Sequence, residues 1–290
     1  MTLVMKYRGR TFSQEELIRI QEVATSNWNS SRRLLSRIIC EEFNWRRPDG
    51  GLKDMACRCV FLKMEKDGIL NLRPVKKVSE FHKTKGPIRT DRGEPAAVLC
   101  KDLKDLADIR VEMAQGKDEK ALWSELVDRY HYLGYTCMGG AQLRYLIKSG
   151  DSVLGCIGWS AAAWKTASRD NFIGWNPDQR ERNLHFVINN SRFLILPWVN
   201  VKCLASKVLG LSARRLSDDW QTIYKYRPVL LETFVEKQKF VGTCYKAANW
   251  QLVGETTGRG RYDRYNNKIV PVKTIWLYPL TDSFRKTLCL

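Results

Sequence analysis

Three carboxylates have the residue types and positions that catalysis would need. Asp170, Asp219 and Glu232 each stand beside strand-like or helix-end sequence. Three carboxylates can hold Mg²⁺ for two-metal cleavage of a phosphodiester bond, so one hypothesis is a metal-dependent nuclease with these catalytic residues. Their spacing in the sequence does not by itself place the three side chains together. The structural alternatives are an ion pair of Asp170 with Arg169, a helix cap at Asp219 and a pair of Glu232 with a nearby cation.

Other polar groups suit a proton or a phosphate. His131 lies between two tyrosines and is a candidate general base, although an aromatic helix end is also a common structural feature. The run Gly258-Arg259-Gly260-Arg261 places two arginines among glycines, which suits phosphate binding or stacking on bases. The alternative for this run is an ordinary surface turn.

The cysteine pattern argues against a metal site. The chain has nine cysteines, and only Cys57 and Cys59 are close together. A two-residue step is too short for the usual zinc spacing. We expect buried, reduced thiols and no structural metal.

The charge balance favours a polyanionic partner. Among 290 residues there are 49 Lys and Arg against 31 Asp and Glu, a formal net charge of +18. Such a surplus attracts phosphate backbones, and an apolar content of 44% is that of a folded chain. The sequence has no run of about 20 apolar residues, and its start lacks the apolar core of a signal peptide. We therefore expect a cytoplasmic protein with no membrane partner.

The elements that must position these groups begin with a helical head. The pattern predicts helices over 12–24, 32–43 and 52–66, the last stopped at Gly68, then a strand over 69–72 and a basic wing over 73–77. Residues 1–77 therefore read as a winged helix-turn-helix domain. In the third helix four residues face inward: Cys57, Val60, Phe61 and Met64. Six face outward: Met55, Arg58, Cys59, Leu62, Lys63 and Lys66.

The basic residues of the head are the candidate contacts to nucleic acid. Residues 31–90 hold 15 Lys and Arg against 7 Asp and Glu. Arg58 is placed to read base edges, whereas the wing would contact phosphates. The alternatives are a solvated basic face and a protein-docking module. The full set of candidate contacts is Lys53, Arg58, Lys63, Lys66, Arg73, Lys76, Lys77, Arg192, Arg259 and Arg261.

Residues 78–97 are basic and rich in Gly and Pro, which indicates a linker. The alternating pattern of residues 98–290 predicts a mixed α/β domain after it. We expect helices over 101–113, 117–130, 160–167, 201–209, 217–224 and 242–250. We expect strands over 142–148, 153–160, 184–196, 229–235, 251–257 and 274–278.

Several longer motifs carry a family resemblance. They are Trp45, Leu52-Lys53-Asp54-Met55 and Gly68 in the head, then Tyr132-Leu133-Gly134, Arg169-Asp170, Ile173-Gly174-Trp175, Asn189 to Pro197, Leu231 to Val235, and Gly258 to Arg261. Together they resemble the family of the A protein of the Druantia anti-phage systems, also found near mobile elements. The resemblance covers nearly the whole chain. It implies a role in defence or mobile-element biology, and it brings no catalytic residues with it.

A looser resemblance concerns fold. The strand over 184–196, the loop 197–201 and the helix after it are similar to the cofactor-binding stretch of the GNAT acyltransferases. In that family a glycine-rich loop and a helix start hold the pyrophosphate of coenzyme A. The loop here, Pro197-Trp198-Val199-Asn200-Val201, contains no glycine. This departure argues against acyl-CoA as a cofactor.

The resulting expectation is an α+β protein, with a winged helix-turn-helix head followed by a GNAT-like mixed α/β body. Its function would be to bind DNA, or structured RNA, as the recognition component of an anti-phage or mobile-element complex with other protein subunits. The alternatives are a nuclease that uses Mg²⁺, a GNAT-type acyltransferase or base modifier, and a protein-docking scaffold.

Overall fold

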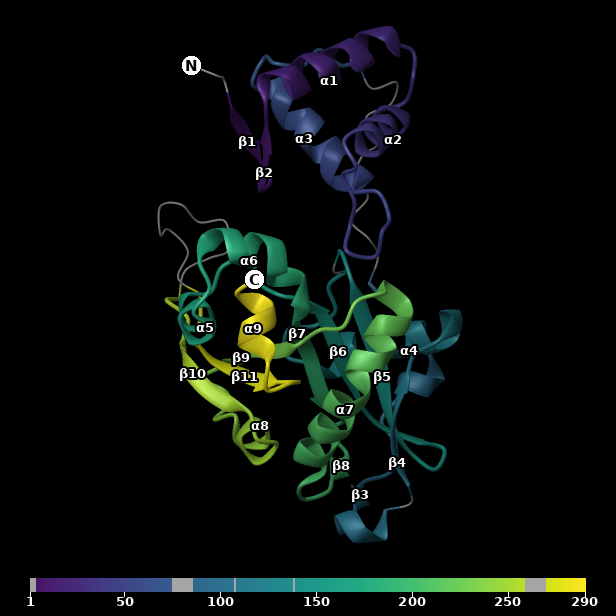
Figure 1. Ribbon diagram of the computed structural model, residues 1–290. Helices are drawn as coiled ribbons and strands as arrows, with labels where there is room; N and C mark the ends of the chain where they lie inside the picture. Colours follow the sequence, from purple (N-terminus) through teal and green to yellow (C-terminus); the bar gives the residue numbers. More distant parts are fainter. Residues whose placement is uncertain (1–3, 75–85, 107, 138, 259–269) are drawn as a thin grey trace. The chain divides into compact units, whose positions relative to one another are not determined.

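The chain divides into two compact units, Met1–Thr84 and Lys85–Leu290. The computed structural model describes residues 4–74, 86–106, 108–137, 139–258 and 270–290 (Figure 1). The division lies inside the stretch 78–97 that the sequence suggests as a linker. Part of that stretch is anchored, because Thr90 donates two 2.7 Å hydrogen bonds to Glu125 and Arg129 donates to the carbonyl of Gly93.

The first unit has a β-hairpin followed by three helices. Its elements are β1 (Met5–Tyr7), β2 (Arg10–Phe12), α1 (Gln14–Ser26), α2 (Arg32–Glu42) and α3 (Asp54–Lys66). Ser13 forms a capping box with Glu16 at the start of α1, and Ser31 caps α2. The three predicted helices are therefore confirmed, with their ends shifted by one or two residues.

The helices of this unit close around one apolar core. The four residues of α3 expected to face inward are each at most 2% exposed. They pack with Phe12, Ile39 and Trp45. The outward-facing set is confirmed too, because Met55 is 64% and Leu62 is 48% exposed.

The expected strand at 69–72 is wrong. Residues 69–74 form no strand, because Leu70 and Leu72 are buried in the helical core instead of pairing with a neighbour. Ile69 donates to the carbonyl of Met64, which closes the end of α3 around Gly68. Arg73 donates to the carbonyl of Asn29, so it is not on a projecting wing. Lys76 and Lys77 lie outside the described residues.

The second unit is built on a seven-stranded mixed sheet. Its strand order is β10-β11-β9-β7-β6-β5-β4, and all neighbours are antiparallel except β7 and β9. The bounds are β4 (Ile109–Met113), β5 (Gln142–Ser149), β6 (Ser152–Ala161), β7 (Val187–Ile195), β9 (Leu230–Glu236), β10 (Gln251–Glu255) and β11 (Lys273–Pro279). A separate two-residue ladder joins β3 (Leu99–Cys100) to β8 (Val199–Asn200). The expected mixed α/β class is confirmed.

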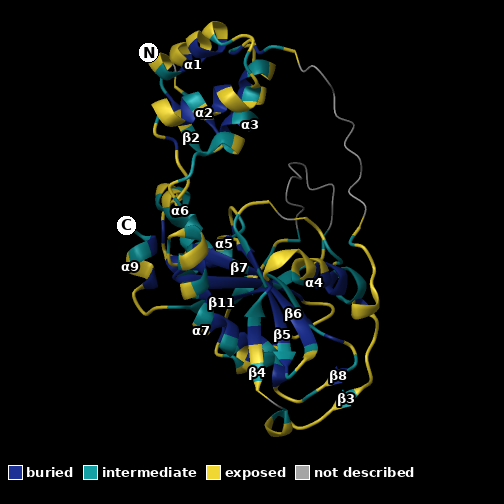
Figure 2. Cartoon of the chain, turned by 90° about the vertical axis from the view of Figure 1, so that its right-hand side faces the viewer, coloured by how far each residue is buried: buried dark blue, intermediate teal, exposed yellow. Residues whose placement is uncertain are grey.

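Helices cover this sheet and supply its cores. They are α4 (Gly116–Tyr130), α5 (Ala167–Ile173), α6 (Pro177–Asn183), α7 (Leu204–Tyr224), α8 (Thr243–Ala247) and α9 (Phe284–Leu288), with short 3₁₀ turns at Asp91–Gly93, Leu103–Asp105 and Leu184–Phe186. One apolar cluster gathers α4, α7 and α8 onto the sheet, and a second packs α5 and α9 against β9 and β11. The central strands are buried, as Figure 2 shows in dark blue. None of the described helices has the length and apolar character to cross a membrane.

Four expected helices need three corrections. Most of the first, 101–113, is not helical, because residues 109–113 form edge strand β4 paired with β5. The second, 160–167, is mostly the end of β6 and a loop, and α5 begins only at Ala167. The third correction joins 201–209 and 217–224 into the single helix α7, whose buried face runs from Leu204 to Trp220 past Gly210. Packing of that face outweighs the cost of about 1 kcal/mol for an internal glycine.

The cysteines differ in part from expectation. All nine, which lie within the described residues, are free thiols. Cys40, Cys57 and Cys156 are buried as expected, but Cys100, Cys137 and Cys203 are exposed.

Candidate functional site

The parallel strands β7 and β9 part from each other within the sheet. Their ladder covers four pairs, from Val187 with Leu230 to Asn190 with Thr233, although β7 continues to Ile195 and β9 to Glu236. Strands that part leave a gap that other side chains must fill. Here the gap opens into a cavity of about 570 Å³, a size typical of small-molecule sites.

The cavity lining comes from five segments of the second unit and contains no carboxylate side chain. The segments are the end of α4 with the three residues after it (130–133), β7 (190–195), β9 (233–235), the loop after β9 (239–242) and the start of α8 (243–245). We call this cavity the β7/β9 pocket.

The polar side chains at the base of the pocket bond to one another. The Tyr245 hydroxyl donates to Asn190 Oδ1 at 2.8 Å, and Thr233 Oγ1 donates to the Asn190 carbonyl at 3.2 Å. Asn190 Nδ2 in turn donates to the carbonyls of Gly158 and Arg192. Burial raises the pKa of Tyr245, so its hydroxyl stays protonated. The network ties α8 to both strands where they part.

Arg192 brings an uncompensated positive charge to the pocket. Its Nε donates to the Gly134 carbonyl at 3.1 Å and its Nη1 to the Ser191 carbonyl at 2.7 Å. Within the described part of the chain no carboxylate forms an ion pair with it. Burial lowers its pKa, although an arginine remains charged at neutral pH. A half-buried cation with only carbonyl partners favours an anionic ligand.

The rim of the pocket is aromatic and exposed. Tyr132 is 40% and Phe240 48% exposed, and their ring centroids are 5.3 Å apart. The Lys239 ammonium lies 4.6 Å from the Tyr132 ring centroid and 3.1 Å from Glu236 Oε1. Lys239 is therefore largely neutralised, which leaves Arg192 as the dominant charge.

His131 is suited to donating a hydrogen bond rather than to accepting a proton. Burial, with a smaller effect from Arg192, lowers the pKa of His131 to about 4. The ring is therefore neutral at pH 7, and its Nδ1 accepts the Leu133 N–H at 3.2 Å. The remaining proton must sit on Nε2. This geometry argues against the hypothesis of a general base.

Two of the three candidate catalytic carboxylates meet at one buried arginine. Arg169 Nη1 lies 2.9 Å from Glu232 Oε2, and Arg169 Nη2 lies 2.8 Å from Asp170 Oδ1. Arg169 and Glu232 are both 0% exposed. Burial raises the pKa of Glu232, and the Arg169 charge opposes that rise. Neighbouring strand residues face opposite sides, so Glu232 enters this cluster while Thr233 lines the pocket.

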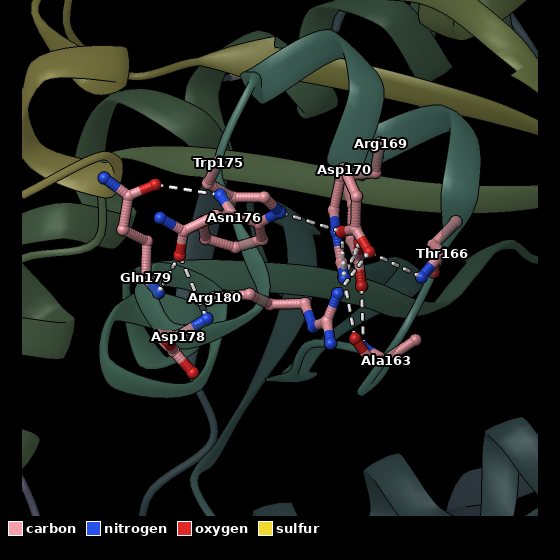
Figure 3. Close-up of polar contacts among 10 residues, drawn as sticks. Ala163, Thr166, Arg169, Asp170, Trp175, Asn176, Asp178, Gln179 and Arg180 are labelled. Atoms are coloured by element: carbon pink, nitrogen blue, oxygen red, sulfur yellow. Dashed lines mark hydrogen bonds and ion pairs between the residues drawn. The ribbon is translucent and has the colours of Figure 1, made fainter.

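Further contacts complete the cluster, and Figure 3 shows most of them. Asp170 accepts from Arg180 at 3.2 Å and from the Trp175 indole at 3.1 Å. The Ala163 amide donates to Glu232 at 2.8 Å, and Arg169 donates to the Ala163 carbonyl. The cluster thus holds α5, α6 and the loop after β6 against β9.

Asp219 lies outside this cluster. It sits inside α7 rather than at a helix start, and it accepts hydrogen bonds from Tyr145 at 2.8 Å and Arg215 at 2.7 Å. It is therefore not a helix cap. In the described ranges no group of three or more His, Cys, Asp or Glu side chains is arranged to hold a metal ion.

The loop expected to resemble a coenzyme A site is engaged by other protein groups. Its Val199 and Asn200 form the parallel ladder with β3, and the Trp198 carbonyl accepts the Leu99 amide at 2.8 Å. The Trp198 ring packs edge-on against Tyr130 at 5.0 Å. Together with the missing glycine, this pairing argues further against a phosphate cradle at this loop.

Among the described residues, the candidate contacts of the head other than Arg73 lie on or beside α3. Lys63 and Lys66 are exposed and have no ion-pair partner among the described residues. Arg58 is paired with Asp54 at 3.3 Å, and Lys53 precedes the first turn of α3. The structure does not describe Arg259 and Arg261. Arg192 belongs to the pocket of the other unit.

Sequence reasoning missed the pocket as a unit. It singled out His131 and Arg192 separately, and gave no role to Asn190, Tyr245 or Phe240. One signal was present, because the motifs at 132–134, 189–197 and 231–235 all contribute to the pocket lining. Their common location is visible only once the strands are placed.

Comparison with known proteins gives a family and a set of distant structures. A family model described as Druantia protein DruA matches residues 63–274, which excludes the motifs at Trp45 and 52–55. No curated protein sequence matches the chain. An aminoglycoside acetyltransferase bound to coenzyme A is 12% identical, covers 62% of this chain and 99% of its own, and has a TM-score of 0.39. An N-acyl amino acid synthase from uncultured soil microbes is 10% identical, with 63% and 95% coverage and a TM-score of 0.36. An N-acetyltransferase from Staphylococcus aureus Mu50 is 9% identical, with 60% and 99% coverage and a TM-score of 0.36. Likeness at this level carries no conclusion about activity.

Proposed function

Because this chain belongs to the Druantia protein DruA family, we propose that it acts in anti-phage defence as a component that binds nucleic acid, either DNA or structured RNA. Other subunits of the defence system would be its protein partners. The proposal combines the family with the charge of the chain, which is +18 overall. Binding of this kind is driven by replacement of counterions along the phosphate backbone.

The observation that carries the proposal is a surplus of unpaired, exposed cations on the first unit. Residues 4–74 hold 14 Lys and Arg against 9 Asp and Glu. Four exposed cations have no ion-pair partner within the described residues and lie on two packed helices, Arg33 and Arg37 on α2 and Lys63 and Lys66 on α3. Cations placed only for solubility would more often be balanced by neighbouring carboxylates.

The outer face of α3 also carries apolar groups. Met55, Cys59, Leu62 and Lys66 follow one another at helical spacing of four, three and four residues. On a recognition helix such a face can contact phosphates through its lysines and thymine methyl groups through its apolar side chains. Arg58 would have to leave Asp54 to read a base edge, so we assign it a smaller share of affinity than Lys63 and Lys66.

The test compares the wild-type chain with the double variant Lys63→Gln/Lys66→Gln in binding titrations across salt concentrations. Labelled duplex DNA and a structured RNA are the two ligands. Loss of two phosphate contacts should lower the slope of log K against log salt by about two. The matched control is Arg19→Gln, because Arg19 is already paired with Glu22 and Glu42. Equal slopes for wild type and double variant would remove the proposed surface.

The nuclease alternative has its own requirement. Asp170 and Glu232 would have to give up their arginines to bind Mg²⁺, and Asp219 would not join them. A nuclease would cleave DNA only with a divalent cation and would lose that activity in Glu232→Gln. Base modification or acyl transfer would instead use the β7/β9 pocket and show a thermal shift with acyl-CoA.

A further inference from the structure

The β7/β9 pocket combines a half-buried cation with an exposed aromatic ring, and the proposed binding surface of the first unit does not involve either group. We propose that it binds one nucleotide unit, with the phosphate on Arg192 and the base against Phe240. The inference extends the proposed function, which supplies a nucleic acid strand as one source of the nucleotide. The other source is a free nucleotide.

The charge of the pocket selects an anion. Arg192 donates hydrogen bonds from Nε and Nη1 to two carbonyl oxygens, which fix the plane of its guanidinium. Because a carbonyl carries no net charge, the positive charge of Arg192 stays unbalanced. The lining contains no carboxylate, so an organic cation would find no counter-charge in it. A fixed planar guanidinium is the group best suited to a phosphate.

The rim of the pocket selects a flat, partly apolar group. Phe240 is 48% exposed and stands at the opening beside Tyr132. Tyr132 already has two close ring contacts, with the His131 ring centroid at 4.9 Å and the Lys239 ammonium at 4.6 Å. Phe240 is therefore the ring on which a base can stack, and such stacking tolerates any base.

Polar groups in the lining complete the match to a nucleotide rather than to an acyl chain. His131 is neutral, and its Nε2–H can donate a hydrogen bond to a phosphate or to the edge of a base. An acyl or pantetheine chain would leave the Arg192 charge unpaired, which is costly. The loop that would hold the phosphates of coenzyme A is paired with β3 instead.

The experiment is isothermal titration of the full chain with dAMP, dCMP, dGMP and TMP, and with a 5′-phosphorylated single strand. Arg192→Gln should weaken mononucleotide binding about tenfold or more, since it removes a charge-assisted contact. Phe240→Ala, on an exposed loop where folding is not at risk, should weaken it about fivefold or more. Lys246→Gln is the control, because Lys246 is exposed and is not part of the lining. It should bind as wild type does.

The outcomes separate this inference from the proposed function. Tight binding of duplex DNA with no binding of any mononucleotide would overturn the pocket assignment and leave the function standing. Binding of mononucleotides but of no strand would support the pocket, identify the source as a free nucleotide and overturn the function. Equal mononucleotide affinity in wild type, Arg192→Gln and Phe240→Ala would overturn the pocket assignment, as would acetyl-CoA that binds more tightly and displaces the nucleotide.

Discussion

Replacing Arg169 by Met should destabilise the second unit strongly. The substitution removes the ion pair with Glu232 at 2.9 Å, the pair with Asp170 at 2.8 Å and the hydrogen bond to the Ala163 carbonyl. Glu232 is 0% exposed and would keep only the Ala163 amide at 2.8 Å as partner. Breaking a buried pair by removing one partner typically costs about 3–5 kcal/mol. Asp170 is less affected, because Arg180 still pairs with it.

The companion variant is Arg169→Met/Glu232→Leu, in which the buried charge is gone. Because an apolar pair can replace a buried ion pair at little cost, we expect it to recover about half of the lost stability. Lys237→Met is the control, since Lys237 and Glu255 form an exposed pair at 2.7 Å worth at most about 1 kcal/mol.

The assay is urea unfolding followed by circular dichroism and by tryptophan fluorescence. Because the chain has two units, each unit is fitted with its own unfolding transition. A single Arg169→Met variant that loses less than about 1 kcal/mol would refute the reasoning, as would a double variant less stable than the single one. Either result would mean that the buried charges are not held by Arg169.

The other predictions concern the pocket and the surface. Tyr245→Phe should cost about 1–3 kcal/mol, because it leaves Asn190 Oδ1 buried without its 2.8 Å donor, and a urea titration measures this. The pKa of His131 is about 4 in the folded chain and about 6.5 when unfolded, so the unfolded chain takes up the proton first. Stability should therefore fall as the pH drops from about 6.5 to about 4 and should not change through this group above pH 7. His131→Asn should flatten that fall in melting temperature measured against pH; an unchanged profile would mean that the His131 pKa is not lowered.

Local signals predicted the helices of the first unit well. Ser13 and Ser31 cap helices whose starts lie within two residues of the predicted ones, and Gly68 ends α3 with a φ of +73°. The inward face of α3 followed directly from its apolar spacing. Most core strands of the second unit were also found, because apolar runs bounded by turn residues indicate buried strands.

Elsewhere the predictions were wrong because contacts between residues distant in sequence decide the local structure. Residues 69–72 look like a strand, but burial of Leu70 and Leu72 among helices decides their conformation. Residues 109–113 become strand because β5 offers a partner edge. A propensity scale contains neither fact.

The sites were harder still to predict. Arg169 and Glu232 are 63 residues apart in sequence, and their contact depends on how α5 packs against the sheet that contains β9. The pocket exists because β7 and β9 stop pairing after Asn190 and Thr233, and no local pattern encodes where two strands part. The sequence therefore pointed to Asp170, Asp219 and Glu232 as a set, although only two of them meet.

Cross-linking tests the central claim most directly. The full chain is purified without nuclease treatment, irradiated with whatever nucleic acid accompanies it, digested and mapped by mass spectrometry. Our account predicts cross-linked peptides from α3 that carry the Met55 to Lys66 face. A chain that brings no nucleic acid with it and forms no cross-link to added DNA or RNA would contradict the account.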